Sequence, residues 1–325
     1  MPRSYLDIAK ELIRAESVAI ASLENRIDEN FENAVELLYR TSGKVVVTGV
    51  GKSGLIGQKI AATLSSTGTP SFFLHSYEAG HGDLGSVSKH DALILISNSG
   101  ETNEIIYMLP YLKKIKVPVI GFIGNSKSSL AKKCNIVIDT GVSTEACPLG
   151  IVPTASTIVT LAMGDALAIA LMNKRKFKEI DFAGLHPGGS LGRRLLTTVQ
   201  DLMHTGDAIP LASINDNMQQ VLFTMTKKGL GVVGILDSEE NLAGVITDGD
   251  LRRGLEHTET FLNVLPTDIM TKNPKHLISS TLAIDALYQM EKFAVTNLFV
   301  FNEDKIGKPT GIIHIHDILR YGIMV

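Results

Sequence analysis

Residues 44–62 read KVVVTGVGKSGLIGQKIAA, and this stretch decides the fold class. A β-branched run passes into a turn that holds three glycines, and a segment with helical periodicity follows. Where a strand enters a glycine turn that opens a helix, backbone N–H groups and the helix dipole can hold an anion. Lys52 adds a full positive charge to this turn. We infer that the turn forms one wall of a phosphosugar site.

Two other phosphate-binding motifs fit this turn poorly. A Walker A loop needs four residues between its first glycine and the Gly-Lys-Ser, but Gly49 lies only two residues before it. In a dinucleotide fingerprint the pyrophosphate needs a close backbone approach, and Lys52 stands at that point. A tight βα turn without a ligand remains the alternative interpretation of these residues.

Length, composition, net charge and cysteine content limit the class of protein. A chain of 325 residues is long enough for about two domains of roughly 150 residues. The hydrophobic content of 44% with 20% charged residues describes an ordinary globular protein. A net charge of −3 gives no electrostatic reason to expect nucleic acid as a partner. Cys134 and Cys147 form no Cys-x-x-Cys pair, so neither a disulfide framework nor a zinc ribbon is indicated.

The N-terminal segment is charged from the start and has no apolar signal core. No uninterrupted apolar run reaches the roughly 20 residues of a membrane span, so we expect no membrane association and a cytoplasmic location. Apolar residues recur at helical spacing over residues 4–40, which predicts a long amphipathic helix there. We expect this helix to take part in an oligomer contact.

After Lys44, strands and helices alternate. The predicted strands are 44–48, 71–75, 91–96, 117–122 and 135–139. The predicted helices begin near Ser53, Thr102, Ser128 and Thr154. Apolar strands that alternate with helices predict an α/β fold, a doubly wound parallel sheet flanked by helices. Ligands of such sheets bind at the carboxyl ends of the strands.

A second motif at residues 93–104 reads LILISNSGETNE. An apolar strand ends in small polar residues and a glycine, and a helix follows. The hydroxyls of Ser97, Ser99 and Thr102, together with N–H groups of the turn, can converge on one anion. Ser99 or Thr102 alone could cap the helix. A cap accounts for one hydroxyl, so three around a glycine favour a ligand.

Histidines occur in two further motifs. In residues 72–85, FFLHSYEAGHGDLG, His81 is framed by glycines, which is unusual for a core residue, and His75 ends the strand. A zinc site at His75 and His81 would need third and fourth ligands, which are not evident nearby. In residues 181–194, DFAGLHPGGSLGRR, His186 precedes a proline and two glycines. We expect His186 to reach into a site, either in its own subunit or in a neighbouring one.

These motifs together resemble the sugar isomerase (SIS) family, and within it the bacterial D-arabinose 5-phosphate isomerases. The residues that carry the resemblance are 49–54, 75–85, 97–102 and 184–192. The serine-rich turn is shared by SIS-type sugar-phosphate binders, whereas the HPGGSLG segment joined to the histidine loop is more specific.

The C-terminal part contains an internal repeat over residues 201–257 and 268–325. Asp201-Leu202-Met203 recurs as Asp268-Ile269-Met270, and Gly244-Val245-Ile246 recurs as Gly311-Ile312-Ile313. This is similar to a tandem pair of CBS motifs, a regulatory module attached to these isomerases. We therefore expect an SIS domain over residues 1–198 and an α+β CBS pair over residues 199–325.

The resemblance implies the interconversion of D-ribulose 5-phosphate and D-arabinose 5-phosphate through an enediol, the first step of Kdo and lipopolysaccharide biosynthesis. It implies no cofactor, no required metal and a homotetramer, and it allows an inhibitory zinc ion at His75 and His81. The catalytic residues that match the family are Lys52, His81, Glu104 and His186. The expected substrate-binding residues are Gly51, Ser53, His75, Ser97, Asn98, Ser99, Gly100, Glu101 and Thr102.

Roles follow from the chemistry that such an isomerase needs. The proton that moves between C1 and C2 requires a base, and Glu104 is our first choice, with Glu101 as its competitor. Lys52 stabilises the enediolate oxygen or binds the substrate as a point charge. His81 and His186 can shuttle protons between oxygens near neutral pH, and either could also be the base.

A CBS pair often binds an adenine nucleotide between its repeats, so a nucleotide or sugar nucleotide is the expected regulatory ligand. The residues at the matching places are Thr247, Asp248, Asp250, His314 and Asp317. His314 and His316 alternate along a predicted strand and share a face, which permits metal binding as well as a solvated strand end.

Two alternative functions remain. The first is an SIS isomerase of another phosphosugar, such as a hexulose phosphate. The second is a non-catalytic sugar-phosphate sensor, but such regulators carry an N-terminal helix-turn-helix domain, and only about 40 residues precede the first strand here. The residues leave open whether the product serves lipopolysaccharide, a capsule or sugar utilisation.

Overall fold

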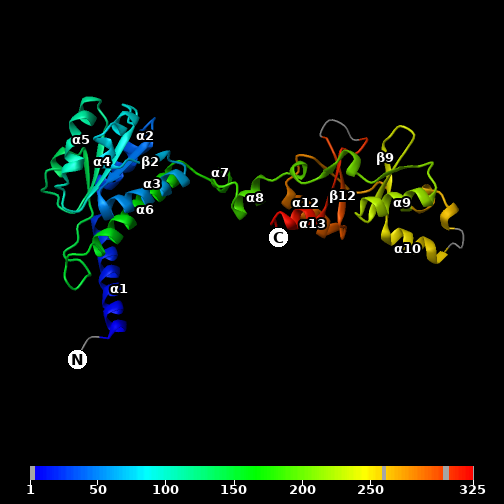
Figure 1. The fold of residues 1–325 in the computed structure, drawn as a ribbon, viewed down its shortest axis with the longest axis horizontal. Coiled ribbons are helices and arrows are strands. Elements are labelled where there is room, and N and C mark those ends of the chain that lie inside the picture. Colours follow the sequence, from blue (N-terminus) through cyan, green and yellow to red (C-terminus); the bar gives the residue numbers. More distant parts are fainter. Residues whose placement is uncertain (1–3, 258–260, 303–306, 325) are drawn as a thin grey trace. The chain divides into compact units, whose positions relative to one another are not determined.

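In the computed structural model, residues 44–62 form the predicted βα unit (Figure 1). β1 (Val45–Gly49) is buried along its whole length, and α3 (Gly51–Ser66) follows it. Gly51 has a φ of +57°, in the left-handed region that glycine adopts without strain. A Cβ on Gly54 would lie 2.9 Å from the carbonyl oxygen of Gly49. The glycines therefore allow both the sharp turn and the close approach of the helix to the strand.

The structure describes residues 4–257, 261–302 and 307–324. Contacts divide the chain into two units, Met1–Phe182 and Ala183–Val325, whereas the sequence predicts a boundary after residue 198. The predicted domains also extend over residues 1–3, 258–260, 303–306 and 325, which lie outside the described residues.

The first unit is built on one parallel sheet of five strands. Its order is β2-β1-β3-β4-β5, with β2 (Ser71–Phe73), β3 (Ala92–Ser97), β4 (Val119–Ile123) and β5 (Ile136–Asp139) beside β1. Successive residues of a strand face opposite sides of the sheet. Val45 and Val47 pack on the side of α3 and α6 (Ala155–Lys174), while Val46 packs on the side of α5 (Asn103–Lys114). The predicted doubly wound α/β class is confirmed.

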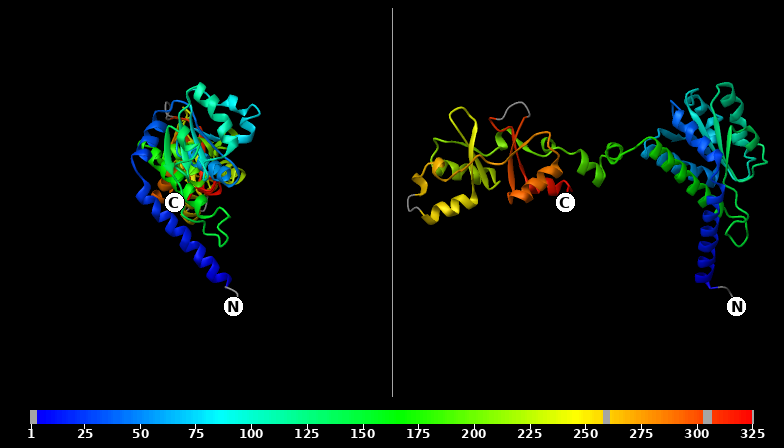
Figure 2. Two further views of the ribbon diagram at one scale, coloured as in Figure 1. Left: turned by 90° about the vertical axis from the view of Figure 1, so that its left-hand side faces the viewer. Right: turned by 180° about the vertical axis from the view of Figure 1, so that it is seen from behind.

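The N-terminal segment is two helices and not the single helix predicted over residues 4–40. α1 (Tyr5–Ala21) runs into a 3₁₀ turn, η1 (Ser22–Arg26), and α2 (Glu29–Arg40) begins anew. The break occurs because Asp28 is extended and its side chain accepts the N–H of Asn30 as an N-cap. No side chain of α1 is buried within the chain, and Figure 2 shows the helix extending from the sheet layers.

The helix predicted near Ser128 is only a 3₁₀ turn, η3 (Ala131–Lys133), because β5 begins at Ile136 and leaves no room for more turns. α6 is long and apolar enough to cross a membrane by length and composition, but half of its apolar window is buried inside the protein. Its packing against α3 and the sheet is that of a core helix.

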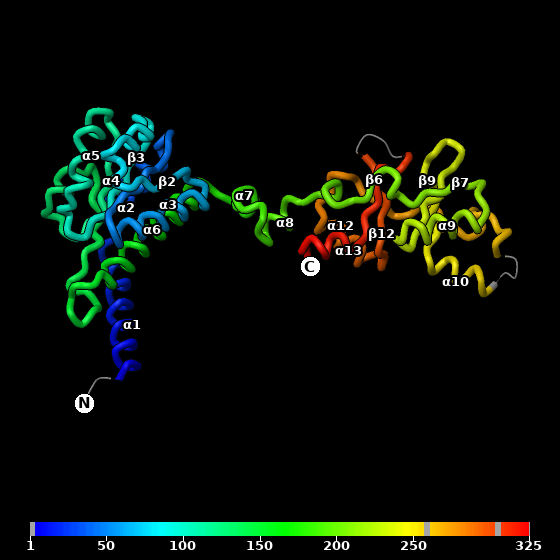
Figure 3. The backbone as a smooth tube through the Cα atoms, viewed as in Figure 1, coloured from blue at the N-terminus to red at the C-terminus, as the bar shows by residue number. Residues whose placement is uncertain are grey.

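The second unit contains two four-stranded sheets (Figure 3). The first has the order β10-β9-β8-β7, made of β7 (Leu211–Ser213), β8 (Val232–Leu236), β9 (Leu242–Thr247) and β10 (Thr271–Lys272). The second has the order β11-β12-β13-β6, made of β6 (His204–Thr205), β11 (His276–Ile278), β12 (Asn297–Phe301) and β13 (Gly311–His314). Each repeat thus contributes one short strand, β6 or β10, to the sheet of the other.

The two repeats also match in their helices. α9 (Met218–Lys228) ends at Gly229 with φ +69°, and α12 (Ala283–Phe293) ends at Ala294 with φ +52°. The predicted internal repeat therefore extends to the left-handed residue that ends each helix. The remaining helices are α4 (Ser76–Ala79), η2 (Asp83–Ser86), α7 (Glu179–Leu185), α8 (Ser190–Leu196), η4 (Val199–Asp201), η5 (Gly206–Ala208), α10 (Asp248–His257), η6 (Phe261–Asn263), α11 (Pro266–Ile269) and α13 (Ile315–Arg320).

Candidate active site

Two helix N-termini meet at the carboxyl edge of the parallel sheet. β1 and β3 are hydrogen-bonded neighbours, so the turns that follow them lie side by side. The N-cap residues of α3 and α5 are Val50 and Thr102, and neither makes a side-chain capping hydrogen bond. N–H groups in the first turn of each helix therefore remain available to an anion, and the helix dipoles favour it.

The serine-rich turn is shaped by its own hydroxyls. Ser97 is almost fully buried, and its Oγ accepts the N–H of Gly100 at 2.9 Å and lies 2.8 Å from Oγ1 of Thr102. Gly100 has φ +69°, and a Cβ there would lie 2.0 Å from Oγ of Ser128. Ser97 thus organises the turn, whereas Ser99 and Asn98 are exposed at its tip. The N–H of Glu101 donates to Oγ of Ser99 at 3.2 Å.

The carboxylate of Glu101 has a structural partner. Its Oε1 accepts the backbone N–H of Ser129 at 2.8 Å, in the loop after β4. Hydrogen bonds from Ser129 are the main cause of a lowered pKa of Glu101, and Lys132 and Lys133 lower it further. The carboxylate is therefore directed toward Ser129.

A cavity of about 160 Å³ lies beside the glycine–lysine turn. Lys52 and Ser53 from the start of α3 line it together with Asn98 from the serine-rich turn. The structure thus brings together three predicted site residues from two different motifs. The opposite wall consists of Pro153, which lies just before α6, and of Ser156, Thr157 and Thr160 in the first turns of α6.

The wall formed by α6 was not predicted as part of the site. Its N-terminus is closed by Glu145, whose Oε2 accepts the N–H of Thr154 at 2.9 Å and that of Ser156 at 3.2 Å. Burial raises the pKa of Glu145, but hydrogen bonds from Ser156 and Thr154 outweigh it and the pKa is lowered. A glutamate ahead of polar residues that open an apolar helix is the signal that could have revealed this wall.

The histidine loop follows β2. His75 is the exposed N-cap residue of α4, and its ring lies 6.3 Å from that of Phe73 in an edge-on arrangement. His81 is also exposed, and its ring lies 4.7 Å from that of Tyr77. Over the described residues, no group of three or more His, Cys, Asp or Glu side chains is arranged to hold a metal ion. The zinc alternative at His75 and His81 therefore gains no further ligand from the fold.

The other two catalytic candidates lie on separate elements. Glu104 is exposed in the first turn of α5, and α4, which leads to His81, packs against α5. His186 lies in the loop between α7 and α8, where a Cβ on Gly192 would come within 2.3 Å of its carbonyl oxygen. His186 belongs to the second unit, so the geometry of the first unit does not include it.

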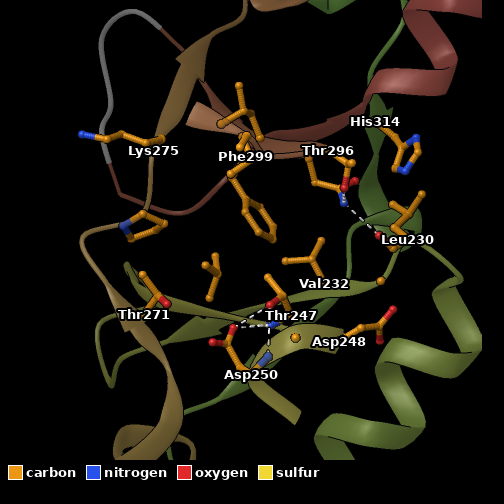
Figure 4. Close-up of a pocket in the computed structure, with 18 of the residues that line it drawn as sticks. Leu230, Val232, Thr247, Asp248, Asp250, Thr271, Lys275, Thr296, Phe299 and His314 are labelled. Atoms are coloured by element: carbon orange, nitrogen blue, oxygen red, sulfur yellow. Dashed lines mark hydrogen bonds between the residues drawn. The ribbon is translucent and has the colours of Figure 1, made fainter. Parts of the chain in front are cut away.

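The second unit has a cavity of about 720 Å³ between its two repeats (Figure 4). Four of the five predicted regulatory residues line it, namely Thr247, Asp248, Asp250 and His314. Asp317 is not among the lining residues; its Oδ2 lies 2.9 Å from Nε2 of His204.

The prediction that His314 and His316 share a strand face is wrong. β13 ends at His314, which is the N-cap residue of α13, and His316 lies in the first turn of that helix. The ring Nδ1 of His314 accepts the N–H of His316 at 3.0 Å. This local cap turns the chain from strand to helix, because a side-chain acceptor satisfies an N–H group that the helix leaves unpaired.

Models of two known families match the chain. The SIS domain family matches residues 38–180, and the CBS domain family matches residues 199–257 and 267–323. The arabinose 5-phosphate isomerase KdsD of Pseudomonas aeruginosa is 46% identical over 320 residues, which cover 98% of each chain. The chain belongs to the arabinose 5-phosphate isomerase family. The predicted resemblance to SIS isomerases with a tandem CBS pair is confirmed.

A second sequence relative and one solved structure support the same family. The arabinose 5-phosphate isomerase KdsD of Escherichia coli K12 is 44% identical over 98% of this chain and 97% of its own length. Among solved structures, an Escherichia coli CFT073 protein in complex with arabinose 5-phosphate is 45% identical. It matches with a TM-score of 0.55 over 57% of this chain and 100% of its own.

Proposed function

We propose that this protein is an aldose–ketose isomerase that interconverts D-ribulose 5-phosphate and D-arabinose 5-phosphate. Two observations support this most strongly. The chain is similar over its full length to arabinose 5-phosphate isomerases, and Lys52, Ser53 and Asn98 line a cavity at the sheet edge. The two uncapped helix N-termini beside it suit a phosphate. The product then enters Kdo biosynthesis in the cytoplasm.

In this proposal the phosphate is bound by N–H groups of α3 and α5 with the hydroxyls of Ser53, Ser99 and Thr102, and Ser97 keeps the turn in shape. Glu104 takes the carbon-bound proton, and Lys52 stabilises the enediolate oxygen. His81 and His186 move protons between oxygens. The reaction needs no net oxidation, so we expect no redox cofactor.

A coupled assay on the purified protein tests the substrate. We expect turnover of ribulose 5-phosphate and arabinose 5-phosphate at least a hundredfold above that of a panel of hexose and hexulose phosphates. The reason is that the site must be complementary to one transition state. Faster turnover of a hexulose phosphate would favour the isomerase of another sugar, and binding without any turnover would favour a sensor.

A second experiment tests the wall formed by α6. Glu145→Gln keeps the shape of the side chain but removes the charge at the helix N-terminus. We expect a loss of about 1 kcal/mol in the free energy of unfolding at pH 7. Because α6 lines the cavity with Lys52, we also expect kcat/KM to fall about tenfold. Glu291→Gln, at an exposed position of α12 in the second unit, is the matched control.

The effect of Glu145 on stability should depend on pH in a defined direction. The folded-state pKa of Glu145 is lowered, so its contribution is present above the unfolded-state pKa of about 4.3. It is lost as the pH falls through the folded-state pKa. Urea unfolding of wild type and Glu145→Gln should therefore converge toward pH 3. A difference that persists there unchanged would show that shape, and not charge, is responsible.

We infer a second function for the CBS pair, the binding of a regulatory nucleotide or sugar nucleotide in the cavity of about 720 Å³. Its location between the repeats and the presence of Thr247, Asp248 and Asp250 favour this.

We also propose that α1 takes part in a homotetramer, since Tyr5, Leu6 and Val18 are at least 70% exposed within one chain. An inhibitory zinc ion at His75 and His81 stays a hypothesis, which a titration of the protein with zinc would test.

A further inference from the structure

The cavity of the second unit has an apolar part and a polar part. Val232, Val245 and Phe299 come from β8, β9 and β12 and form the apolar part. Thr247 and Asp248 lie where β9 passes into α10, and Figure 4 shows both below the side chains of Val232 and Phe299. An apolar slot beside an exposed carboxylate suits a flat base whose attached sugar offers hydroxyl donors.

The positive charge of Arg253, which lines this cavity, is already paired with the carboxylate of Asp250. Oδ1 of Asp250 accepts a hydrogen bond from the guanidinium of Arg253 at 2.6 Å. Its Oδ2 accepts the N–H of Thr247 at 2.8 Å and the hydroxyl of Thr247 at 2.7 Å. Asp250 is only 8% exposed, whereas the side chain of Arg253 is 68% exposed. A ligand phosphate would have to compete with a carboxylate for Arg253.

Two other groups that could carry positive charge offer little to a phosphate. The ammonium of Lys275 lies 5.1 Å from the ring centroid of Phe293, and Figure 4 shows its side chain pointing away from Phe299. The ring Nδ1 of His314 accepts the N–H of His316 and is therefore unprotonated. Burial and the neighbouring His316 lower the pKa of His314, against the opposing effect of Asp317; His204 and Arg320 lower it further.

A negative charge remains without a partner. The carboxylate of Asp248 makes no ion pair within the described ranges, and its Oδ2 lies 3.0 Å from the position of a Cβ on Gly231, another lining residue. The N-terminus of α10, which would otherwise attract an anion, already faces the carboxylates of Asp248 and Asp250. Each additional phosphate of a ligand would thus approach the exposed, unpaired carboxylate of Asp248 and be repelled by it.

We propose that this cavity recognises its ligand through the nucleoside part and discriminates against additional phosphates, so that it takes a nucleoside or nucleoside monophosphate in preference to the triphosphate. This proposal rests on the proposed nucleotide-binding function of the CBS pair, and it specifies the class of ligand that the cavity takes. Asp248 is its main determinant.

Isothermal titration calorimetry on the full-length protein, without divalent metal, tests this selectivity. The ligands are adenosine, AMP and ATP in one series and cytidine, CMP and CTP in the other. In the series that binds, we expect the triphosphate to bind at least tenfold more weakly than the monophosphate. Asp248→Asn should narrow that ratio to below threefold. The control Asp285→Asn, an exposed acid in the first turn of α12 outside the cavity, should leave it unchanged.

The outcomes separate the two proposals. Equal or tighter binding of the triphosphate by the wild type would overturn the selectivity while leaving nucleotide binding intact. A ratio that Asp248→Asn does not change would remove Asp248 as its determinant. If neither series binds, the nucleotide-binding proposal fails, and the selectivity fails with it.

Discussion

Glu104→Gln is expected to lower kcat by about a hundred- to ten-thousandfold, because it removes the base that takes the carbon-bound proton. The side chain is exposed in the first turn of α5 and makes no hydrogen bond or ion pair with the other residues that the structure describes. Gln has the same shape and a similar helix propensity. The thermal midpoint should therefore change by less than about 2 °C, and the loss can be attributed to chemistry.

The exchange of the substrate's C1 and C2 hydrogens with solvent separates proton abstraction from later steps. We expect Glu104→Gln to lose this exchange in parallel with turnover. Glu101→Gln is the matched control, since its carboxylate binds the N–H of Ser129. That variant should keep kcat within about tenfold of the wild type. Exchange at the wild-type rate in Glu104→Gln would assign the base to another group, and His81 and His186 would be tested next.

The βα frame was predictable from the sequence because its signal is local. Strands buried on both faces are nearly continuous apolar runs, and the five predicted strands agree with the observed ones to within about two residues. The glycines of the first turn were also readable, since positive φ at Gly51 and close packing at Gly54 each demand a residue without a Cβ.

The parts that were missed depend on competing local caps or on contacts distant in sequence. The helix over residues 4–40 breaks because Asp28 caps a new helix, and periodicity does not register such a break. Ser97 was expected to face the phosphate, yet its neighbours in the turn use its hydroxyl. Glu145 lies in a loop without periodicity, and only the fold brings that loop to the first turn of α6 beside Lys52. Periodicity therefore predicts which elements form, whereas the partners of polar side chains need the structure.

Lys52→Met is expected to lower kcat/KM by about a hundred- to thousandfold, the usual cost of removing one group that stabilises a developing oxyanion. Lys52 lies at the N-terminus of α3 and lines the cavity beside the serine-rich turn, and it forms no ion pair among the residues described. Met retains the length and much of the apolar stem, so the change removes the charge with little loss of packing. The matched control is Lys59→Met on the same helix, because Lys59 pairs with Asp165 of α6 outside the cavity.

The division of the loss between kcat and KM decides which role Lys52 has. If Lys52 stabilises the enediolate, the charge is needed mainly in the transition state, so kcat should fall and KM should stay within about threefold. If Lys52 binds the substrate phosphate in ground state and transition state alike, KM should rise at nearly constant kcat. Steady-state kinetics in both directions of the reaction distinguish the two results. Because N–H groups of α3 and α5 can hold the phosphate without a lysine, we expect the loss in kcat; a rise in KM alone would move Lys52 to the phosphate.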